Sequence, residues 1–306
     1  MAASAIAFST MAALVKLAGP GIPNQELVAL RSLASLIPLG VLIWWRGVPV
    51  RFNRPGWLFV RGFLGYIAIS CWFLSLNRLS LPDAVMIQYT SPVFVALMAP
   101  FFLRERSRRR DRWALAVALI GVGIVLRPGF GVTAYGAAIG LGGAVCSAGA
   151  YLTVRSLRHS DHPFMVMLAF PAVAAIGSIL MVLAAPLIGD AVGVGWVWPD
   201  GQEWLLIGGI ALMTALGQIF LTYGLHWEPA GRATVATYLA VVWSIPLGII
   251  LFDQWPDAWM LLGGALVIGS VGVLALTSDR PVPPPAGAGA SQVTDGLTGA
   301  SEEGRG

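Results

Sequence analysis

Residues 80–94, SLPDAVMIQYTSPVF, gather hydrogen-bonding side chains inside one of the most apolar parts of the chain. Gln88, Tyr89 and Ser91 would be costly to expose to lipid, so we expect them to face the interior of a helix bundle or a water-filled cavity. Pro92 leaves a backbone carbonyl without its helical donor, which a membrane tolerates only against protein or water. We interpret the stretch as the lining or gate of a solute pathway. The alternative is that these polar contacts only hold helices together.

A second stretch repeats this pattern near the C-terminus. LHWEPAGRATVATYLAVVWSIPLGIILFD (225–253) can be laid over LNRLSLPDAVMIQYTSPVFVALMAPFFLRE (76–105), which places Tyr238 opposite Tyr89. We predict that the two helices face each other across a central cavity. At similar membrane depth, Trp72 and Trp243 form either an aromatic box for a ligand or part of the packed core. The candidate substrate-binding residues are Lys16, Arg31, Trp72, Gln88, Tyr89, Ser91, Tyr151, Gln218, Tyr223, Thr237, Tyr238 and Trp243.

Two of these candidates, Lys16 and Arg31, are cations near the ends of apolar segments. Together they are suited to attract a carboxylate or a phosphate that enters or leaves. Each also has a simpler interpretation. Lys16 can extend its ammonium group to the membrane interface, and Arg31 can pair with nearby Glu26.

The composition indicates that the chain is embedded in lipid. Apolar residues make up 57% of its 306 positions and charged residues only 11%, whereas soluble domains carry about 25% charged residues. A helix of about 20 apolar residues is long enough to cross the hydrocarbon core. Ten segments are predicted to do so: 2–18, 27–45, 56–76, 83–102, 112–127, 135–154, 163–188, 204–225, 231–252 and 258–276.

The loops predict the orientation of these segments. With the N-terminus inside, most arginines fall in cytoplasmic loops or their flanks, among them Arg61 and those of RERSRRRDR (104–112). This distribution follows the positive-inside rule. Both termini are then cytoplasmic, and residues 277–306 are expected to form a disordered tail because they cannot bury a core. The sequence therefore predicts a multi-pass protein of the cell (inner or plasma) membrane.

The two similar stretches belong to a longer repeat. Residues 2–127 and 135–276 each contain five predicted crossings, and an odd number places the two copies in opposite orientations. The predicted fold is an all-α membrane protein with ten transmembrane helices as two inverted five-helix repeats. Repeats of this kind mark secondary transporters, whose binding site lies near the middle of the membrane between the halves.

The ordered set of segments resembles a ten-helix member of the drug/metabolite transporter superfamily with two EamA-type repeats. The resemblance covers residues 2–276 and implies export or uptake of amino acids or other small metabolites, without choosing among them. It is carried by FSTMAALVKLAG (8–19), ALRSLASLIPLGVLIWWRG (29–47), WFLSLNRLSLPDAVMIQYTSPVFVALMAPFFLRER (72–106), ALIGVGIVLRP (118–128) and the second copy near the C-terminus.

The sequence favours transport over catalysis. It shows no catalytic set such as paired acids or a Ser/His arrangement at one face, so a membrane-embedded enzyme acting on a lipid-linked substrate is the weaker alternative. It also lacks a GxxxxGK[ST] phosphate-binding loop, and we expect no metal, no cofactor and no nucleic-acid partner. The predicted function is secondary transport of a small polar or amphipathic metabolite across the cytoplasmic membrane by alternating access. The expected partners are that small molecule and membrane lipid.

Overall fold

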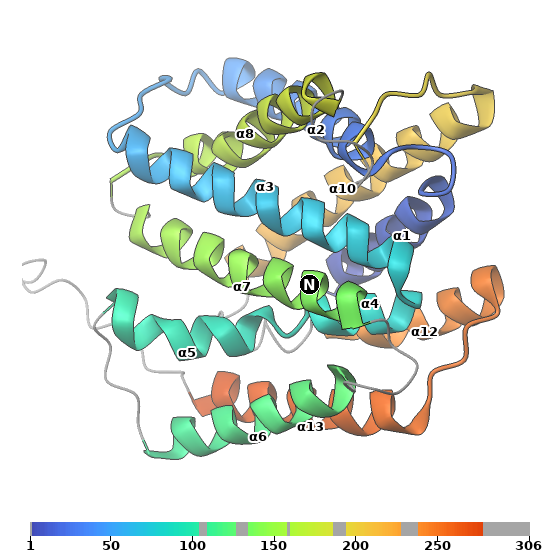
Figure 1. Ribbon diagram of the computed structural model, residues 1–306. Helices are drawn as coiled ribbons and strands as arrows, with labels where there is room; N and C mark the ends of the chain where they lie inside the picture. Colours follow the sequence, from blue (N-terminus) through green and yellow to red (C-terminus); the bar gives the residue numbers. More distant parts are fainter. Residues whose placement is uncertain are drawn as a thin grey trace, which may run out of the picture.

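The computed structural model describes residues 2–103, 109–126, 134–157, 160–185, 194–227 and 238–277, and every regular element in these residues is an α-helix. The chain is an all-α protein, as predicted. In chain order (Figure 1) the helices are α1 (Ala2–Ala18), α2 (Asn24–Trp45), α3 (Pro55–Arg78), α4 (Leu81–Gln88), α5 (Ser91–Leu103), α6 (Arg109–Leu126), α7 (Ala134–Leu157), α8 (Pro163–Leu183), α10 (Gly201–Trp227), α12 (Leu239–Phe252) and α13 (Ala258–Thr277).

The described helices have the lengths and the surface of a membrane bundle. Five are long and apolar enough to cross a membrane, in α2, α3, α7, α8 and α10, and shorter apolar stretches lie in α1, α6, α12 and α13. Large apolar side chains such as Trp44, Phe101, Leu205 and Ile250 are widely exposed. Soluble proteins rarely expose apolar surface on this scale, and the protein is a multi-pass membrane protein.

The fourth apolar segment forms two helices instead of the single helix expected over 83–102. Tyr89 and Thr90 separate α4 from α5. Pro92, the second residue of α5, has no N–H to donate to the carbonyl of Gln88, four residues earlier. Its ring would also clash with that carbonyl in a continuous helix. Thr90 instead donates its hydroxyl to the Ile87 carbonyl at 2.6 Å. The break thus lies directly before the proline that marked this stretch in the sequence.

Parts of several predictions lie outside the described residues, among them residues 104–108 of the arginine-rich loop, residue 127 and residues 186–188. The segment expected over 231–252 is described only from Tyr238 onward, so Thr237 is not covered. The tail expected over 277–306 is described only at Thr277, the last residue of α13.

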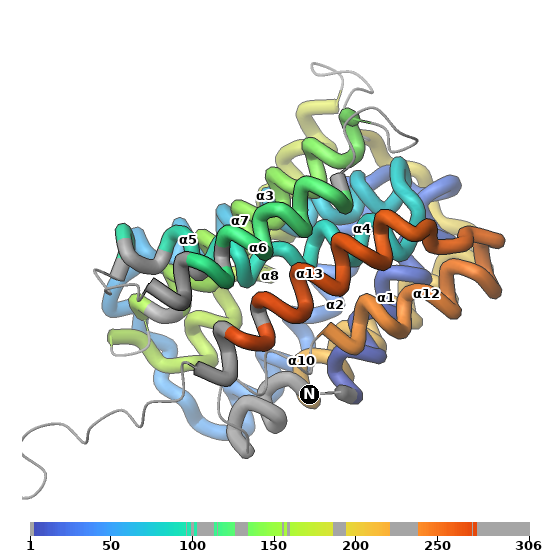
Figure 2. The backbone as a smooth tube through the Cα atoms, turned by 90° about the horizontal axis from the view of Figure 1, so that it is seen from below, coloured from blue at the N-terminus to red at the C-terminus, as the bar shows by residue number. Residues whose placement is uncertain are grey.

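The two halves of the chain interlock rather than forming separate bodies. α1 packs against α10 and α12, whereas α7, the first helix of the second half, packs against α3 and α5. The pairs α2 with α8 and α6 with α13 also join the halves. Figure 1 shows α3 between α8 and α7, and Figure 2 shows α6 beside α13. The first helix of each half thus packs on the third and fourth segments of the other.

Glycines let α3 approach its neighbours closely. A Cβ added at Gly143 of α7 would lie 3.2 Å from the carbonyl oxygen of Ala68 in α3. One added at Gly62 of α3 would lie 2.6 Å from the carbonyl oxygen of Ala169 in α8. In lipid such close packing takes the place of the hydrophobic effect in holding helices together. α3 therefore runs between α7 and α8, where its polar side chains meet theirs.

Loop contacts define the two ends of the bundle. At one end the N–H of Asn53 donates to Asp161 Oδ1 at 2.8 Å, which ties the α2–α3 loop to the α7–α8 loop. At the opposite end the N–H of Val197, in the segment before α10, donates to Glu26 Oε2 at 2.8 Å. We call these the Asn53 end and the Glu26 end. The loops are grouped as the predicted crossings require.

Candidate functional site

The break between α4 and α5 brings the two halves of the chain into direct contact. The ring of Tyr89, which follows α4, lies 6.0 Å between centroids from the ring of Tyr238, which precedes α12, at an interplanar angle of 53°. Tyr238 is 2% exposed, and its hydroxyl has no hydrogen-bond partner among the described residues. The sequence overlay thus pairs two residues that meet in space.

Gln88, Ser91 and Trp72 are largely shielded from the surface. Gln88 donates its amide N–H to the Ser147 hydroxyl of α7 at 3.0 Å. Ser91 and Trp72 are buried, and the Trp72 ring lies 5.8 Å from that of Phe73. The amide oxygen of Gln88 and the indole N–H of Trp72 have no partner among the described residues. The interior therefore contains one donor and one acceptor that no other described residue pairs with.

Tyr151 of α7 lies near both Tyr89 of the tyrosine pair and a cation, Arg61 of α3. Its side chain is 55% exposed at the surface of the bundle. Arg61 was expected to flank a cytoplasmic loop, and it is half-buried in the second turn of α3. The sequence signal for Arg61 as a candidate site residue was its position inside the segment predicted over 56–76. A charged residue within a membrane span is, by default, a candidate for a functional role.

Arg31 lies in the second turn of α2 and is 5% exposed. The central carbon of its guanidinium group is 5.8 Å from the ring centroids of both Phe73 in α3 and Phe170 in α8. Its Nε–H has no hydrogen-bond partner among the described residues. The predicted alternative, a pair with Glu26, is wrong. Glu26 accepts from the N–H of Val197 with one oxygen, and its other oxygen has no partner in the described part of the chain.

Lys16, by contrast, is fully occupied by the fold around it. Its ammonium group donates to the backbone carbonyl of Leu76 at 2.7 Å and to that of Leu79. It also lies 5.5 Å from the ring centroid of Phe252 in α12. Cations interact favourably with the free carbonyls at a helix C-terminus. Lys16 thus links the ends of α1, α3 and α12.

Of the four remaining candidates, the two whose side chains the structure describes, Trp243 and Gln218, are exposed. Trp243 of α12 is 40% exposed, so it does not form a buried aromatic box with Trp72. Gln218 of α10 is also exposed. The side chain of Tyr223 and the whole of Thr237 lie outside the described residues. Among the described residues, no three His, Cys, Asp or Glu side chains are grouped so as to hold a metal ion.

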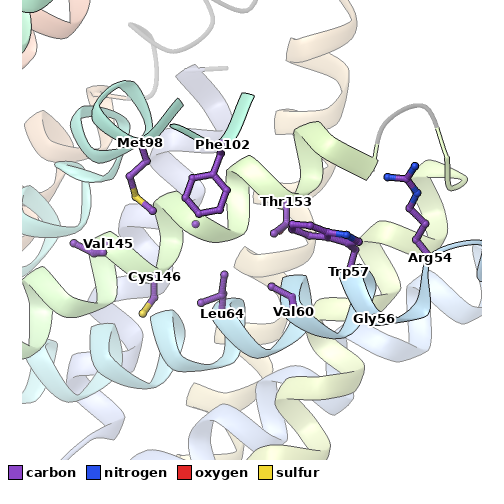
Figure 3. A pocket seen from close by; sticks show the side chains of 11 residues that line it. Arg54, Gly56, Trp57, Val60, Leu64, Met98, Phe102, Val145, Cys146 and Thr153 are labelled. Atoms are coloured by element: carbon purple, nitrogen blue, oxygen red, sulfur yellow. The ribbon is translucent and has the colours of Figure 1, made fainter. Parts of the chain in front are cut away.

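An apolar groove of about 890 Å³ lies between α3, α5 and α7. Figure 3 shows Trp57, Val60 and Leu64 of α3 below it and Phe102 of α5 above it, with Arg54 at the end nearest Asn53. None of the twelve predicted substrate-binding residues lines this groove. The groove is therefore separate from the predicted substrate-binding residues, and its lining is mostly apolar.

The protein is similar along most of its length to known transporters. It is 32% identical over 276 residues to the pseudopaline exporter CntI of Pseudomonas aeruginosa, which covers 89% of this chain and 93% of that protein. It is 28% identical over 225 residues to human solute carrier family 35 member G1, covering 69% of this chain and 59% of that protein. A solved crystal structure matches with a TM-score of 0.58 and 23% identity over 91% of this chain and 98% of the other, which shows the shared fold.

The family comparison matches the chain in two stretches, residues 1–127 and 134–276, which meet between α6 and α7. The family and the named relatives are transporters and not enzymes. The resemblance seen in the sequence is confirmed, and the protein is a membrane transporter. The chain belongs to the EamA-like transporter family.

Proposed function

We infer that this transporter moves a small polar or amphipathic metabolite, such as an amino acid or a related compound, across the cytoplasmic membrane by alternating access. The observation that carries this inference is the broken fourth segment, which holds Tyr89 against Tyr238 of the other half. Secondary transporters commonly build their midplane sites from discontinuous helices, which supply free backbone groups and polar side chains. The break is therefore the centre of the proposed substrate site.

The interlocked halves suggest which bodies move. α1 with α10 and α12 forms one unit, and α7 with α3 and α5 forms the other. The Tyr89–Tyr238 contact lies where these units meet, because Tyr89 precedes α5 and Tyr238 precedes α12. Rocking of one unit against the other would open the centre alternately to the Asn53 end and to the Glu26 end. Each unit contains helices from both proposed repeats, 2–127 and 135–276. The two units are built from corresponding helices of the two repeats.

The proposed substrate contacts come from the partly unsatisfied interior. Tyr89, Tyr151 and Tyr238 offer ring faces and hydroxyls, and Gln88 offers its free amide oxygen. The contacts of Lys16 favour a structural part for that residue. The apolar groove beside α5 gives the non-polar portion of an amphipathic substrate, or a lipid chain, a surface to lie on.

The direction and the orientation are proposed from the relatives and from the arginines. CntI is named an exporter, which supports export by this chain. With both termini cytoplasmic, the Asn53 end faces the cytoplasm. A reporter fused after Arg158 should then read as cytoplasmic, and one inserted within 190–200 as extracytoplasmic. The reverse readings would invert the assignment.

Flux measurements in proteoliposomes test the transport proposal directly. The purified protein is reconstituted, and uptake of a panel of labelled amino acids, small carboxylates and small amines is measured against empty liposomes. We expect at least one polar or amphipathic compound to move faster than in the empty liposomes. No protein-dependent flux across the whole panel would contradict the proposal.

Cys146 reports on alternating access in the same preparation. It lines the apolar groove, and in a Cys71→Ser background it is the only cysteine in the sequence. We expect saturating substrate to change the rate at which a membrane-impermeant maleimide labels Cys146. A rate that stays constant while flux is intact would contradict movement of the units around the centre.

A further inference from the structure

Two arginines share one aromatic ring between α2, α3 and α8. The guanidinium carbon of Arg31 lies 5.8 Å from the ring centroid of Phe170, and that of Arg61 lies 5.3 Å from the same centroid. Arg31 also lies 5.8 Å from the Phe73 ring. The Nε–H of each arginine is buried without a hydrogen-bond partner among the described residues. We refer to Arg31, Arg61, Phe73 and Phe170 as the two-arginine site.

No carboxylate among the described residues neutralises this site. None of the three polar side chains in the first turn of α2 is recorded as a partner of Arg31: Glu26 accepts from the N–H of Val197, and its other oxygen has no partner among the described residues. Asn24 donates to the Ser70 carbonyl at 3.1 Å, and Gln25 accepts from the Tyr66 hydroxyl at 3.0 Å. Arg61 has only a neutral phenol, Tyr151, as its electrostatic neighbour. Both cations are therefore left with ring faces and a hydroxyl group.

Two cations without counter-charge form an energetically unfavourable arrangement inside a membrane bundle. Desolvation of each charge is strongly unfavourable, and contacts with aromatic faces recover only part of that loss. Two like charges beside one ring also repel each other, and they do so more strongly in a low-dielectric interior than in water. An anion placed between them would offset both effects.

We propose that the two-arginine site binds an oxyanion group, a carboxylate or a phosphate, of the transported molecule. This inference rests on the transport function proposed above and gives its substrate a charge class. A guanidinium group presents N–H donors in a planar fork that matches two oxygens of a carboxylate or phosphate. The free Nε–H of Arg31 supplies one side of such a fork. The rings of Phe73 and Phe170 restrict where the fork lies.

The site has an accessible side. Arg61 is only half-buried, and its neighbour Tyr151 is exposed and also lies near Tyr89. A molecule whose oxyanion meets the arginines therefore extends toward Tyr151 and the Tyr89–Tyr238 contact. The substrate that fits both regions is an amphipathic anion, with its charged end at the arginines and the remainder among the tyrosines.

Thermal unfolding of the full-length protein in phosphatidylcholine nanodiscs tests this proposal with defined probes. Succinate and inorganic phosphate are compared with succinamide, the uncharged analogue of succinate, and with potassium chloride at matched ionic strength. We expect succinate, phosphate or both to raise the melting temperature, and the two controls to have no effect. If neither anion stabilises the wild type, the proposal is overturned.

Variants assign the effect to the site. Arg31→Gln and Arg61→Gln should weaken apparent anion affinity about tenfold to a hundredfold, because each removes charge-assisted hydrogen bonds. Arg31→Lys keeps the positive charge but loses the forked N–H donors of the guanidinium group, so it should weaken anion affinity less than Arg31→Gln does. Arg46→Gln is the matched control, since it removes the same charge from an exposed side chain at the end of the same helix. Equal anion affinity in Arg31→Gln and Arg46→Gln would overturn the proposal.

Arg31→Met separates ligand binding from a structural role. Removing an unpaired buried cation should leave the melting temperature of the unliganded protein unchanged or raise it, while the effect of the anion disappears. A lower melting temperature without ligand, in both Arg31→Met and Arg31→Gln, would show that Arg31 supports the fold and would overturn the proposal.

Two further outcomes identify the source of the anion and separate the anionic-substrate proposal from the transport proposal. Stabilisation in phosphatidylglycerol nanodiscs, with no effect of either soluble anion, would assign the site to a lipid headgroup and overturn the substrate assignment. Flux of an uncharged or cationic compound that persists in Arg31→Gln would keep the transport function and reject the anionic substrate. Absence of any flux in the wild type bears on the transport proposal alone.

Discussion

Lys16 and Arg31 lie on neighbouring helices and have opposite surroundings. In the sequence each is a single cation near the end of an apolar segment, and nothing separates their roles. In the structure the Lys16 ammonium is held by the carbonyls of Leu76 and Leu79, whereas Arg31 lies beside two rings and its Nε–H has no partner among the described residues. A buried cation whose donors already meet backbone acceptors serves the packing of helices. One without acceptors keeps its hydrogen-bonding capacity for a ligand.

The largest expected effect is the loss of stability in Lys16→Met. The substitution removes two charge-assisted hydrogen bonds and leaves two carbonyls at the end of α3 without their donor. We expect the free energy of unfolding to fall by about 2–3 kcal/mol. Arg31→Met should show no such loss, so denaturant unfolding of the two variants in the same detergent measures the contrast.

The contrast between Lys16 and Arg31 is contradicted if Lys16→Met lowers substrate affinity and Arg31→Met lowers stability. Lys16→Met with wild-type stability and weakened substrate affinity would place Lys16 in the site. A double variant provides the internal control. Since the two side chains share no described contact, their effects on the free energy of unfolding should be additive.

Tyr238→Phe extends the comparison to a neutral group and should have a smaller effect. The Tyr238 hydroxyl is buried and has no partner among the described residues, so its removal should leave the melting temperature unchanged. If the hydroxyl binds substrate, apparent affinity should weaken by roughly threefold to tenfold. Tyr89→Phe tests the other ring of the pair. Wild-type flux kinetics in both variants would remove the tyrosines from the pathway.

The sequence predicted the overall fold well because lipid constrains it strongly. A length of about 20 apolar residues specifies a crossing, and the overlay of 76–105 on 225–253 pairs Tyr89 with Tyr238, which are in contact. Pro92 likewise marked the place where the fourth segment breaks. These features depend on local composition and spacing, which a single sequence carries.

The partners of the buried charges could not be predicted, because they come from other helices. The carbonyls that hold Lys16 belong to residues sixty or more positions away, and Arg31 meets Phe170 only because α2 packs on α8. The neighbours of Arg61 likewise depend on how α3 packs between α7 and α8. The interlocking of the halves could not be predicted for the same reason. It depends on close contacts between helices, such as that of Gly62 with Ala169, which a hydropathy pattern does not reveal.

The smallest expected effect comes from Tyr66→Phe, which matches Tyr238→Phe in chemistry but removes a hydroxyl that is already used. The Tyr66 hydroxyl donates to Gln25 Oε1 at 3.0 Å and ties α3 to the first turn of α2. Tyr66 is half-buried, so loss of this neutral hydrogen bond should lower the free energy of unfolding by about 0.5 kcal/mol, the lower end of the usual range. Apparent substrate affinity should stay the same, since the substrate is not expected to compete with Gln25 for this group. Unfolding curves and flux kinetics on the same purified variants measure both quantities. Tyr66→Phe and Tyr238→Phe could instead lower substrate affinity equally. A hydroxyl that already has a hydrogen-bond partner would then not indicate a structural residue, and the contrast between Lys16 and Arg31 would not extend to neutral groups.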